Sequence, residues 1–261
     1  MQKNNVDQKK LYDIEYKNKK YSGNLPDYKI TDSKKVCGKK ILVLGAGTGR
    51  DIYYLTKNNK VYATDISDTA IEYLKKMGIS CAKVDLNSKY KIKGSNYDII
   101  IAKDILEHID DPLSLLVTIH NLLSDSGYAV LNVPNHFFFL MRMRYIFGKN
   151  IIWKTPFIDH EKKFDEWNYM HIKFFTWNGF KKMISSANLK ITKKFFDIGT
   201  LNHYTEPKMV SQYLLNESKN FQSRLVKIID IFFPVSIRRL IANLSPNFFS
   251  GSFYVWVKKN V

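Results

Sequence analysis

Three glycines and one aspartate are the residues of this sequence best suited to bind a cofactor. The run Gly45-Ala46-Gly47-Thr48-Gly49 follows a short apolar segment, and Asp65 comes 20 residues after Gly45. Glycine tolerates a positive φ and lets the backbone approach a ligand, because it has no Cβ. A carboxylate at the end of the following strand can accept hydrogen bonds from both hydroxyls of a ribose. These residues therefore indicate a site for an adenosine-containing cofactor, which is either a methyl donor or a dinucleotide.

The residue after the turn argues against a dinucleotide. The dinucleotide fingerprint has a third glycine at the position that is Arg50 here, where glycine allows close packing of the helix on the strand. A nicotinamide enzyme is therefore the disfavoured alternative.

Two histidines are candidates for a catalytic base. His136 follows the fifth predicted strand and His171 precedes a predicted helix, so both are expected near the carboxyl ends of the strands. Imidazole titrates near neutral pH, and a base is needed only if the nucleophile is a protonated hydroxyl or amine. The alternative is that each histidine is structural. Glu107 and His108 are adjacent, and neighbouring side chains on a helix point about 100° apart, so no metal site is predicted.

Alternating apolar and helical segments must position these residues. Short apolar runs predict strands over 40–44, 61–64, 79–84, 97–102 and 128–133, and residues 189–198 and 253–258 are predicted to form an antiparallel pair. Helices are predicted between them, with Ser67, Asp111 and Thr176 as N-caps. This order predicts an α/β fold, a Rossmann-like, doubly wound, mostly parallel sheet of seven strands with the last strand antiparallel. Ligands bind such sheets at the carboxyl ends of the strands.

Two segments interrupt the alternation. Residues 135–175 are rich in aromatic and basic side chains, and residues 201–250 have a helical, amphipathic pattern. We expect a helical lead-in over 1–36 and one domain over 37–261, with these two segments as insertions above the strand ends.

Several motifs carry a family resemblance. The segment Val43 to Gly49 resembles motif I of class I S-adenosylmethionine-dependent methyltransferases. Residues 97–112, 122–135 and 171–176 are similar to segments of the ubiquinone/menaquinone-type (methyltransferase 11/23-like) subgroup. The resemblance covers roughly residues 38–190, and the segment 97–112 is its most specific part. It implies S-adenosyl-L-methionine as the cofactor.

The resemblance also implies roles for individual residues. Gly45, Ala46, Gly47 and Gly49 would back the methionine part of the cofactor, and Asp65 would hold the ribose. The remaining cofactor contacts would be Ile66 on the adenine face, Asp85 and Leu86 at the adenine edge, and Lys103 and Asp104 beside the methyl-donor pocket.

The acceptor is predicted to be a small molecule. The motifs of DNA and protein-arginine methyltransferases are absent from the sequence, and no nucleic-acid-binding module is evident. The basic and aromatic insertion suits a polar, anionic acceptor such as a sugar, a nucleotide sugar or a phosphorylated metabolite, as in surface-polysaccharide biosynthesis. Its predicted contacts are Asn135, Arg142, Arg144 and Tyr145. The aromatic residues could instead form the core of a lid.

Charge and hydropathy leave further alternatives open. The net charge of +17 fits an anionic partner or simple compositional drift. Apolar and basic residues within 201–250 could meet a membrane surface and a quinone or lipid acceptor, or form a dimer contact, so the expected state is a monomer or a homodimer. No signal segment or spanning run is evident, and two cysteines form no framework, so a cytoplasmic location is expected. A non-catalytic cofactor-binding protein is the remaining alternative.

Overall fold

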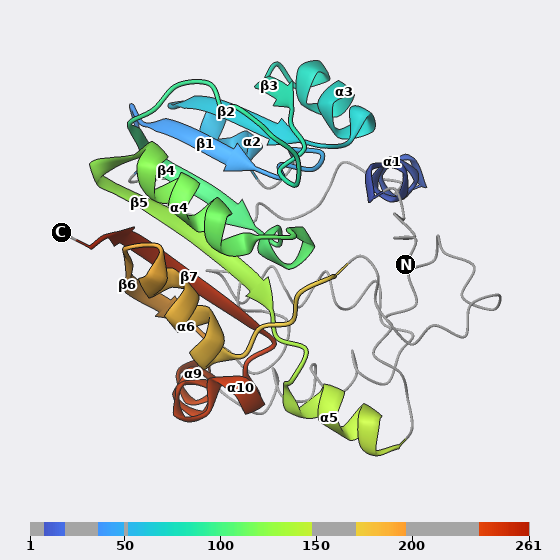
Figure 1. Cartoon of the computed structure of the whole chain (residues 1–261), viewed down its shortest axis with the longest axis vertical. Helices are drawn as coiled ribbons and strands as arrows, with labels where there is room; N and C mark the ends of the chain where they lie inside the picture. The colour runs from blue at the N-terminus through green and yellow to red at the C-terminus, as the bar shows by residue number, and fades with distance from the viewer. Residues whose placement is uncertain (1–7, 19–35, 50–51, 148–170, 197–234, 261) are drawn as a thin grey trace.

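The computed structural model describes residues 8–18, 36–49, 52–147, 171–196 and 235–260. A seven-stranded sheet with the order β3-β2-β1-β4-β5-β7-β6 forms the centre of these residues (Figure 1). Its strands are β1 (Lys40–Leu44), β2 (Lys60–Asp65), β3 (Ser80–Lys83), β4 (Tyr97–Lys103), β5 (Leu123–Pro134), β6 (Leu189–Phe195) and β7 (Ser252–Lys259). Strands β1 to β5 pair in parallel, and β7 runs antiparallel to both β5 and β6. The predicted fold class is confirmed.

The helices begin where the sequence places their capping residues. The Ser67 hydroxyl accepts a hydrogen bond from the Ala70 amide, Asp111 caps Ser114, and the Thr176 hydroxyl caps Gly179. The elements are α1 (Gln8–Asn18), α2 (Tyr53–Thr56), α3 (Asp68–Lys76), a 3-10 turn η1 (Leu106–His108), α4 (Pro112–Leu122), α5 (Phe139–Ile146), α6 (Trp177–Ser186), α9 (Val235–Leu244) and α10 (Pro246–Phe249).

The sheet is buried on both faces because its strands are apolar at consecutive positions. Along β1, Leu42 and Leu44 face the core cluster that contains the buried residues of α4 and α6, whereas Ile41 and Val43 face the cluster under α2 and α3. Figure 1 shows α4 and α6 on one side of the sheet. Burial of each such side chain contributes about 1.5–3 kcal/mol to the stability of the fold. The packed core therefore fixes the positions of the strands and of their carboxyl ends.

The two predicted insertions are described only in part. Residues 148–170 and 197–234 lie outside the described ranges, and so does Arg50. The described part of the first insertion contains α5, and that of the second contains α9 and α10. The division at residue 36 stays a prediction. Among the described helices, none combines the length and the apolar character needed to cross a membrane.

Candidate functional site

The backbone of the glycine turn after β1 lies against two neighbouring elements, the segment after β4 and helix α3. Gly45, Gly47 and Gly49 have φ values of +65°, +53° and +78°. A Cβ on Gly45 would lie 2.7 Å from Cδ1 of Ile105, which follows β4. The absence of a side chain therefore lets β1 and the segment after β4 meet at the point where the strand order reverses, which is where such sheets bind ligands.

Asp65 is fixed at the end of β2 by two backbone amides. Its Oδ2 accepts a hydrogen bond from the Gly47 N–H at 2.8 Å, and its Oδ1 accepts one from the Ser67 N–H at 2.9 Å. The residue is only 6% exposed. Burial raises the pKa of the carboxyl above its usual range, and the amides oppose that shift. Since two carboxylate oxygens offer about four acceptor positions, Asp65 can still accept hydrogen bonds from ribose hydroxyls.

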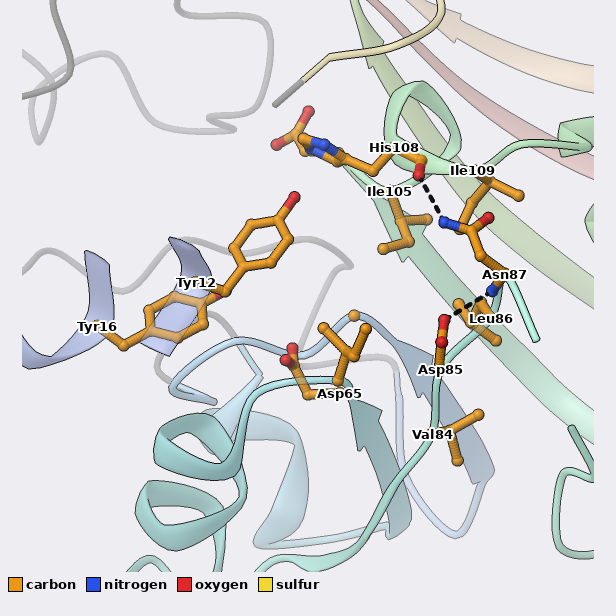
Figure 2. A pocket seen from close by; sticks show the side chains of 13 residues that line it. Tyr12, Tyr16, Asp65, Val84, Asp85, Leu86, Asn87, Ile105, His108 and Ile109 are labelled. Carbon is orange, nitrogen blue, oxygen red and sulfur yellow. Dashed lines mark hydrogen bonds between the residues drawn. The ribbon is translucent and has the colours of Figure 1, made fainter. Parts of the chain in front are cut away.

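A pocket opens at the carboxyl ends of β1 to β4 (Figure 2). Six of the residues predicted to bind the cofactor line it, and these are Gly45, Asp65, Ile66, Asp85, Leu86 and Asp104. The wall is apolar near Ile66 and Leu86 and acidic at Asp65 and Asp85, as a purine and a ribose require. Ala46, Gly47, Gly49 and Lys103 are not among its lining residues. Gly47 acts through its amide on Asp65, and Lys103 lies 3.7 Å from the Asp104 carboxylate.

The N-terminal helix closes one side of this pocket, which the sequence did not predict. Tyr12 and Tyr16 project from α1 toward the cavity, opposite the strand ends (Figure 2). Asp13 holds the helix in place, because it accepts hydrogen bonds from the Ser67 hydroxyl at 2.5 Å and from the Thr69 amide at 3.1 Å. The N-terminus of α3 is thereby joined to α1.

Five further lining residues were also missed, namely Val84, Asn87, Ile105, His108 and Ile109. All of them lie in the segments that follow β3 and β4, so their place after a strand end was the available signal.

The two predicted catalytic histidines lie together. Nε2 of His136 is 2.9 Å from Nδ1 of His171, and Phe174 packs edge-on against His136. Burial, together with the nearby His171, lowers the pKa of His136 to about 3. His136 is therefore neutral at pH 7, and a neutral ring can accept a hydrogen bond from His171.

Glu107 and His108 lie beside this pair. The Glu107 carbonyl accepts hydrogen bonds from the amides of Ile172 and Lys173, which holds the segment that carries His171 against η1. Oε1 of Glu107 is 3.9 Å from Nε2 of His108 and 4.0 Å from Nε2 of His171. The expectation that Glu107 and His108 point apart is therefore wrong. They lie in one 3-10 turn, and the long glutamate side chain reaches back to the imidazole.

The predicted acceptor contacts have different positions. Asn135 is buried, and its Nδ2 donates to the carbonyls of Pro246, Asn247 and Ser250 while its Oδ1 accepts from Phe137. Its amide is therefore used to hold α10, which leaves little capacity for an acceptor.

The basic residues of α5 lie beyond the strand ends. Arg142 is exposed, and its Nε donates to the Phe137 carbonyl at 2.6 Å. The Tyr145 hydroxyl donates to the carbonyl of His136 at 3.2 Å. The Arg144 side chain lies outside the described residues.

A family model for a methyltransferase domain matches residues 25–194, which is more than half of the chain. The chain belongs to this methyltransferase family. Its cofactor is S-adenosyl-L-methionine. The pocket fits that cofactor, because a buried carboxylate, an apolar wall and a glycine turn meet at one edge of the sheet. Asp65 would hold its ribose, and Ile66 and Leu86 would pack on its adenine.

Solved structures share the fold at low sequence identity. An S-adenosylmethionine-dependent methyltransferase from Mesorhizobium loti has a TM-score of 0.54 and 13% identity, with 88% of this chain and 94% of that chain covered. A TehB-like methyltransferase from Corynebacterium glutamicum has a TM-score of 0.50 and 15% identity over 89% and 86% of the two chains. Magnesium protoporphyrin IX methyltransferase from Synechocystis PCC 6803, with bound SAH, has a TM-score of 0.50 and 12% identity over 87% and 77%.

An uncharacterised protein of Haemophilus influenzae is 29% identical over 106 residues. The match covers 36% of this chain and 42% of that curated relative.

Proposed function

We propose that this chain transfers a methyl group from S-adenosyl-L-methionine to an oxygen or nitrogen atom of a small polar acceptor. The observation that supports it best is the contact between His136 and His171, 2.9 Å apart between Nε2 and Nδ1. A hydroxyl or amine acceptor carries a proton that must leave, and an imidazole beside the acceptor can take it.

The cofactor supplies a sulfonium methyl group that is already activated for in-line displacement. The protein's contribution is then to orient the acceptor and to exclude water. If the His171 Nδ1–H donates to neutral His136, the lone pair of His171 lies on Nε2, which is 4.0 Å from Glu107. That nitrogen is the candidate proton acceptor in this tautomer, which we assign because the proposed base needs its lone pair on Nε2.

We place sugars, nucleotide sugars and phosphorylated metabolites first among the acceptors, with a role in surface-polysaccharide biosynthesis. Exposed Arg142 and the net charge of +17 support an anionic acceptor.

The test is a transfer assay with labelled cofactor across nucleotide sugars, phosphorylated metabolites and neutral sugars. We expect transfer to at least one anionic compound, with kcat reduced about 10²–10⁴-fold in His171→Gln. His120→Gln is the matched control, because that imidazole lies on α4 beside Asn121. Tight cofactor binding without transfer to any compound would favour a non-catalytic cofactor-binding protein.

A quinone or lipid acceptor at a membrane surface is a second candidate, and one observation favours it. Ile237, Leu240 and Leu244 of α9 are 44%, 62% and 77% exposed, and Arg239 beside them is exposed as well. Apolar residues flanked by a cation are typical of helices that lie on membranes. Flotation with anionic vesicles tests this candidate, and Leu240→Ser with Leu244→Ser should reduce binding. Absence of wild-type binding eliminates it.

A further inference from the structure

The segment around Glu107 joins three side chains that can each bind a metal ion. One carboxylate oxygen of Glu107 and one ring nitrogen each of His108 and His171 all lie within 4.8 Å of one another. Glu107 and His108 are buried, whereas His171 is 23% exposed in its side chain. The cluster therefore lies below the surface with access on one side.

Glu107 has no hydrogen-bond donor within the described part of the chain. Both of its oxygens are buried, and neither accepts a hydrogen bond there. An ionised carboxylate that is removed from water costs several kcal/mol unless a cation or donors compensate it. The described groups nearest to it that can carry a positive charge are the two imidazoles, and both lie beyond hydrogen-bond distance. The carboxylate is thus placed for a positive group that the described residues do not supply at short range.

We propose that Glu107, His108 and His171 bind one divalent transition-metal ion. Two imidazoles and one carboxylate are a ligand set that proteins use for zinc, with a fourth position left open. Zinc bound at 2.0–2.2 Å holds tetrahedral ligand atoms about 3.4 Å apart. The Glu107–histidine separations of 3.9 and 4.0 Å need to shorten by about half an ångström. The third pair of ligand atoms, which lies within 4.8 Å, needs to shorten by up to about 1.4 Å.

His136 completes the arrangement as a positioning residue. A histidine that binds a metal usually donates its other N–H to an acceptor, which fixes the ring and its tautomer. Nδ1 of His171 lies 2.9 Å from Nε2 of His136, and an Nδ1–H of His171 that donates to this nitrogen leaves the lone pair of His171 on Nε2, which is 4.0 Å from Glu107. The backbone is fixed as well, because the Asn87 Nδ2 donates to the His108 carbonyl at 3.0 Å.

The open position of the ion is next to the cofactor pocket, because His108 lines both. An acceptor oxygen that binds there would be held beside the methyl donor. This role of the ion rests on the proposed function. The ion and direct proton transfer compete for Nε2 of His171. If the ion is used, turnover is lost in EDTA. If His171 is the base, turnover survives EDTA.

The experiment uses the full chain after treatment with EDTA and dialysis. Titration calorimetry with zinc measures binding, and cobalt(II) replaces zinc for visible spectroscopy, since bound cobalt in a four-coordinate site absorbs strongly. We expect one ion per wild-type chain and the same affinity in His120→Gln. Glu107→Gln and His171→Gln should each lose at least about 100-fold in affinity, and His136→Phe about 10–100-fold.

Thermal unfolding provides a readout that does not depend on catalysis. Without zinc, Glu107→Gln and the wild type should unfold at similar temperatures, because burial raises the pKa of Glu107 and so already favours its uncharged form. With zinc, the wild type should gain stability and Glu107→Gln should not.

Two results would overturn the site. One is that the wild type binds no ion, and the other is that Glu107→Gln and His171→Gln bind zinc as the wild type does. Calorimetry with S-adenosylhomocysteine in EDTA separates this proposal from the function. If neither the wild type nor any variant binds S-adenosylhomocysteine, the proposed function is wrong. The zinc stoichiometry then still decides whether the metal site exists.

Discussion

Replacement of Gly49 by alanine tests whether the last glycine of the turn serves packing or the cofactor. Gly49 has φ +78°, and an added Cβ would lie 2.5 Å from Cδ2 of Leu74 and 3.2 Å from Cδ1 of Ile79. The new methyl group therefore points into the contact between the turn and α3. Gly49 does not line the pocket.

The magnitude has two parts. An alanine at positive φ costs about 1–2 kcal/mol, and overpacking a buried contact costs about 1–3 kcal/mol. Gly49→Ala should therefore lower the free energy of unfolding by about 2–5 kcal/mol. Gly78→Ala is the matched control, because Gly78 has φ +71° and nothing within 4 Å of an added Cβ. Gly78→Ala should lower the free energy of unfolding only by the backbone strain, about 1–2 kcal/mol.

Urea unfolding measures both variants, and calorimetry with S-adenosylhomocysteine measures cofactor affinity in the folded fraction. We expect a difference of about 1–3 kcal/mol between the variants and an affinity within about threefold of the wild type for each. Equal destabilisation by the two substitutions would refute the packing argument. A large loss of affinity for S-adenosylhomocysteine in Gly49→Ala, but not in Gly78→Ala, would instead show that Gly49 contributes to the cofactor site.

Three further predictions concern the pocket. Asp65→Ala should weaken binding of S-adenosylhomocysteine by about 1–3 kcal/mol, or about 5–150-fold, in calorimetry; an unchanged affinity would contradict a contact with the ribose. Because burial raises the pKa of Asp65, wild-type affinity should fall as the pH drops through that raised pKa, and Asp65→Ala should lack this pH dependence. Asp13→Ala should lower stability by about 1–3 kcal/mol and speed cofactor release in stopped flow, whereas Lys17→Ala, exposed on the same helix, should change neither.

The sequence predicted the elements whose signals are local. Strand β1 was placed at its observed bounds because an apolar run ends directly in glycines. Strand β5 was predicted to begin at Tyr128, but it begins at Leu123. Its first residues include Ser124 and Asp125, which carry no strand signal. They lie in an irregularity of the register between the pair of Leu123 with Tyr97 and the pair of Tyr128 with Ile99. A partner strand that lies far away in sequence decides such a boundary.

The same distinction holds within the site. Asp65 was found because it ends the strand after the glycine turn, and Asp85 and Asp104 were named from the family resemblance; all three line the pocket. The contacts of α1 were missed, since nothing in a polar helix specifies that Asp13 reaches the Ser67 hydroxyl 54 residues away. The histidine pair was named residue by residue, but its contact depends on the carbonyl of Glu107, which holds residues 172 and 173. Only the folded backbone brings those atoms together.

His108 links the cofactor pocket to the cluster of Glu107 and His171. Its ring lines the pocket, lies 3.9 Å from Glu107 and packs edge-on against Tyr12 of α1 at 5.5 Å between ring centroids. A change of its rotamer that brings Nε2 toward an ion would therefore alter the contact that closes the pocket. Binding at the two places should then be coupled, and the coupling must be reciprocal, so any factor by which zinc changes cofactor affinity equals the factor by which the cofactor changes zinc affinity. Calorimetry in both orders measures the two factors, and Tyr12→Ala should bring both toward one. A cofactor affinity that is the same with zinc and with EDTA would show that the ring moves independently of α1.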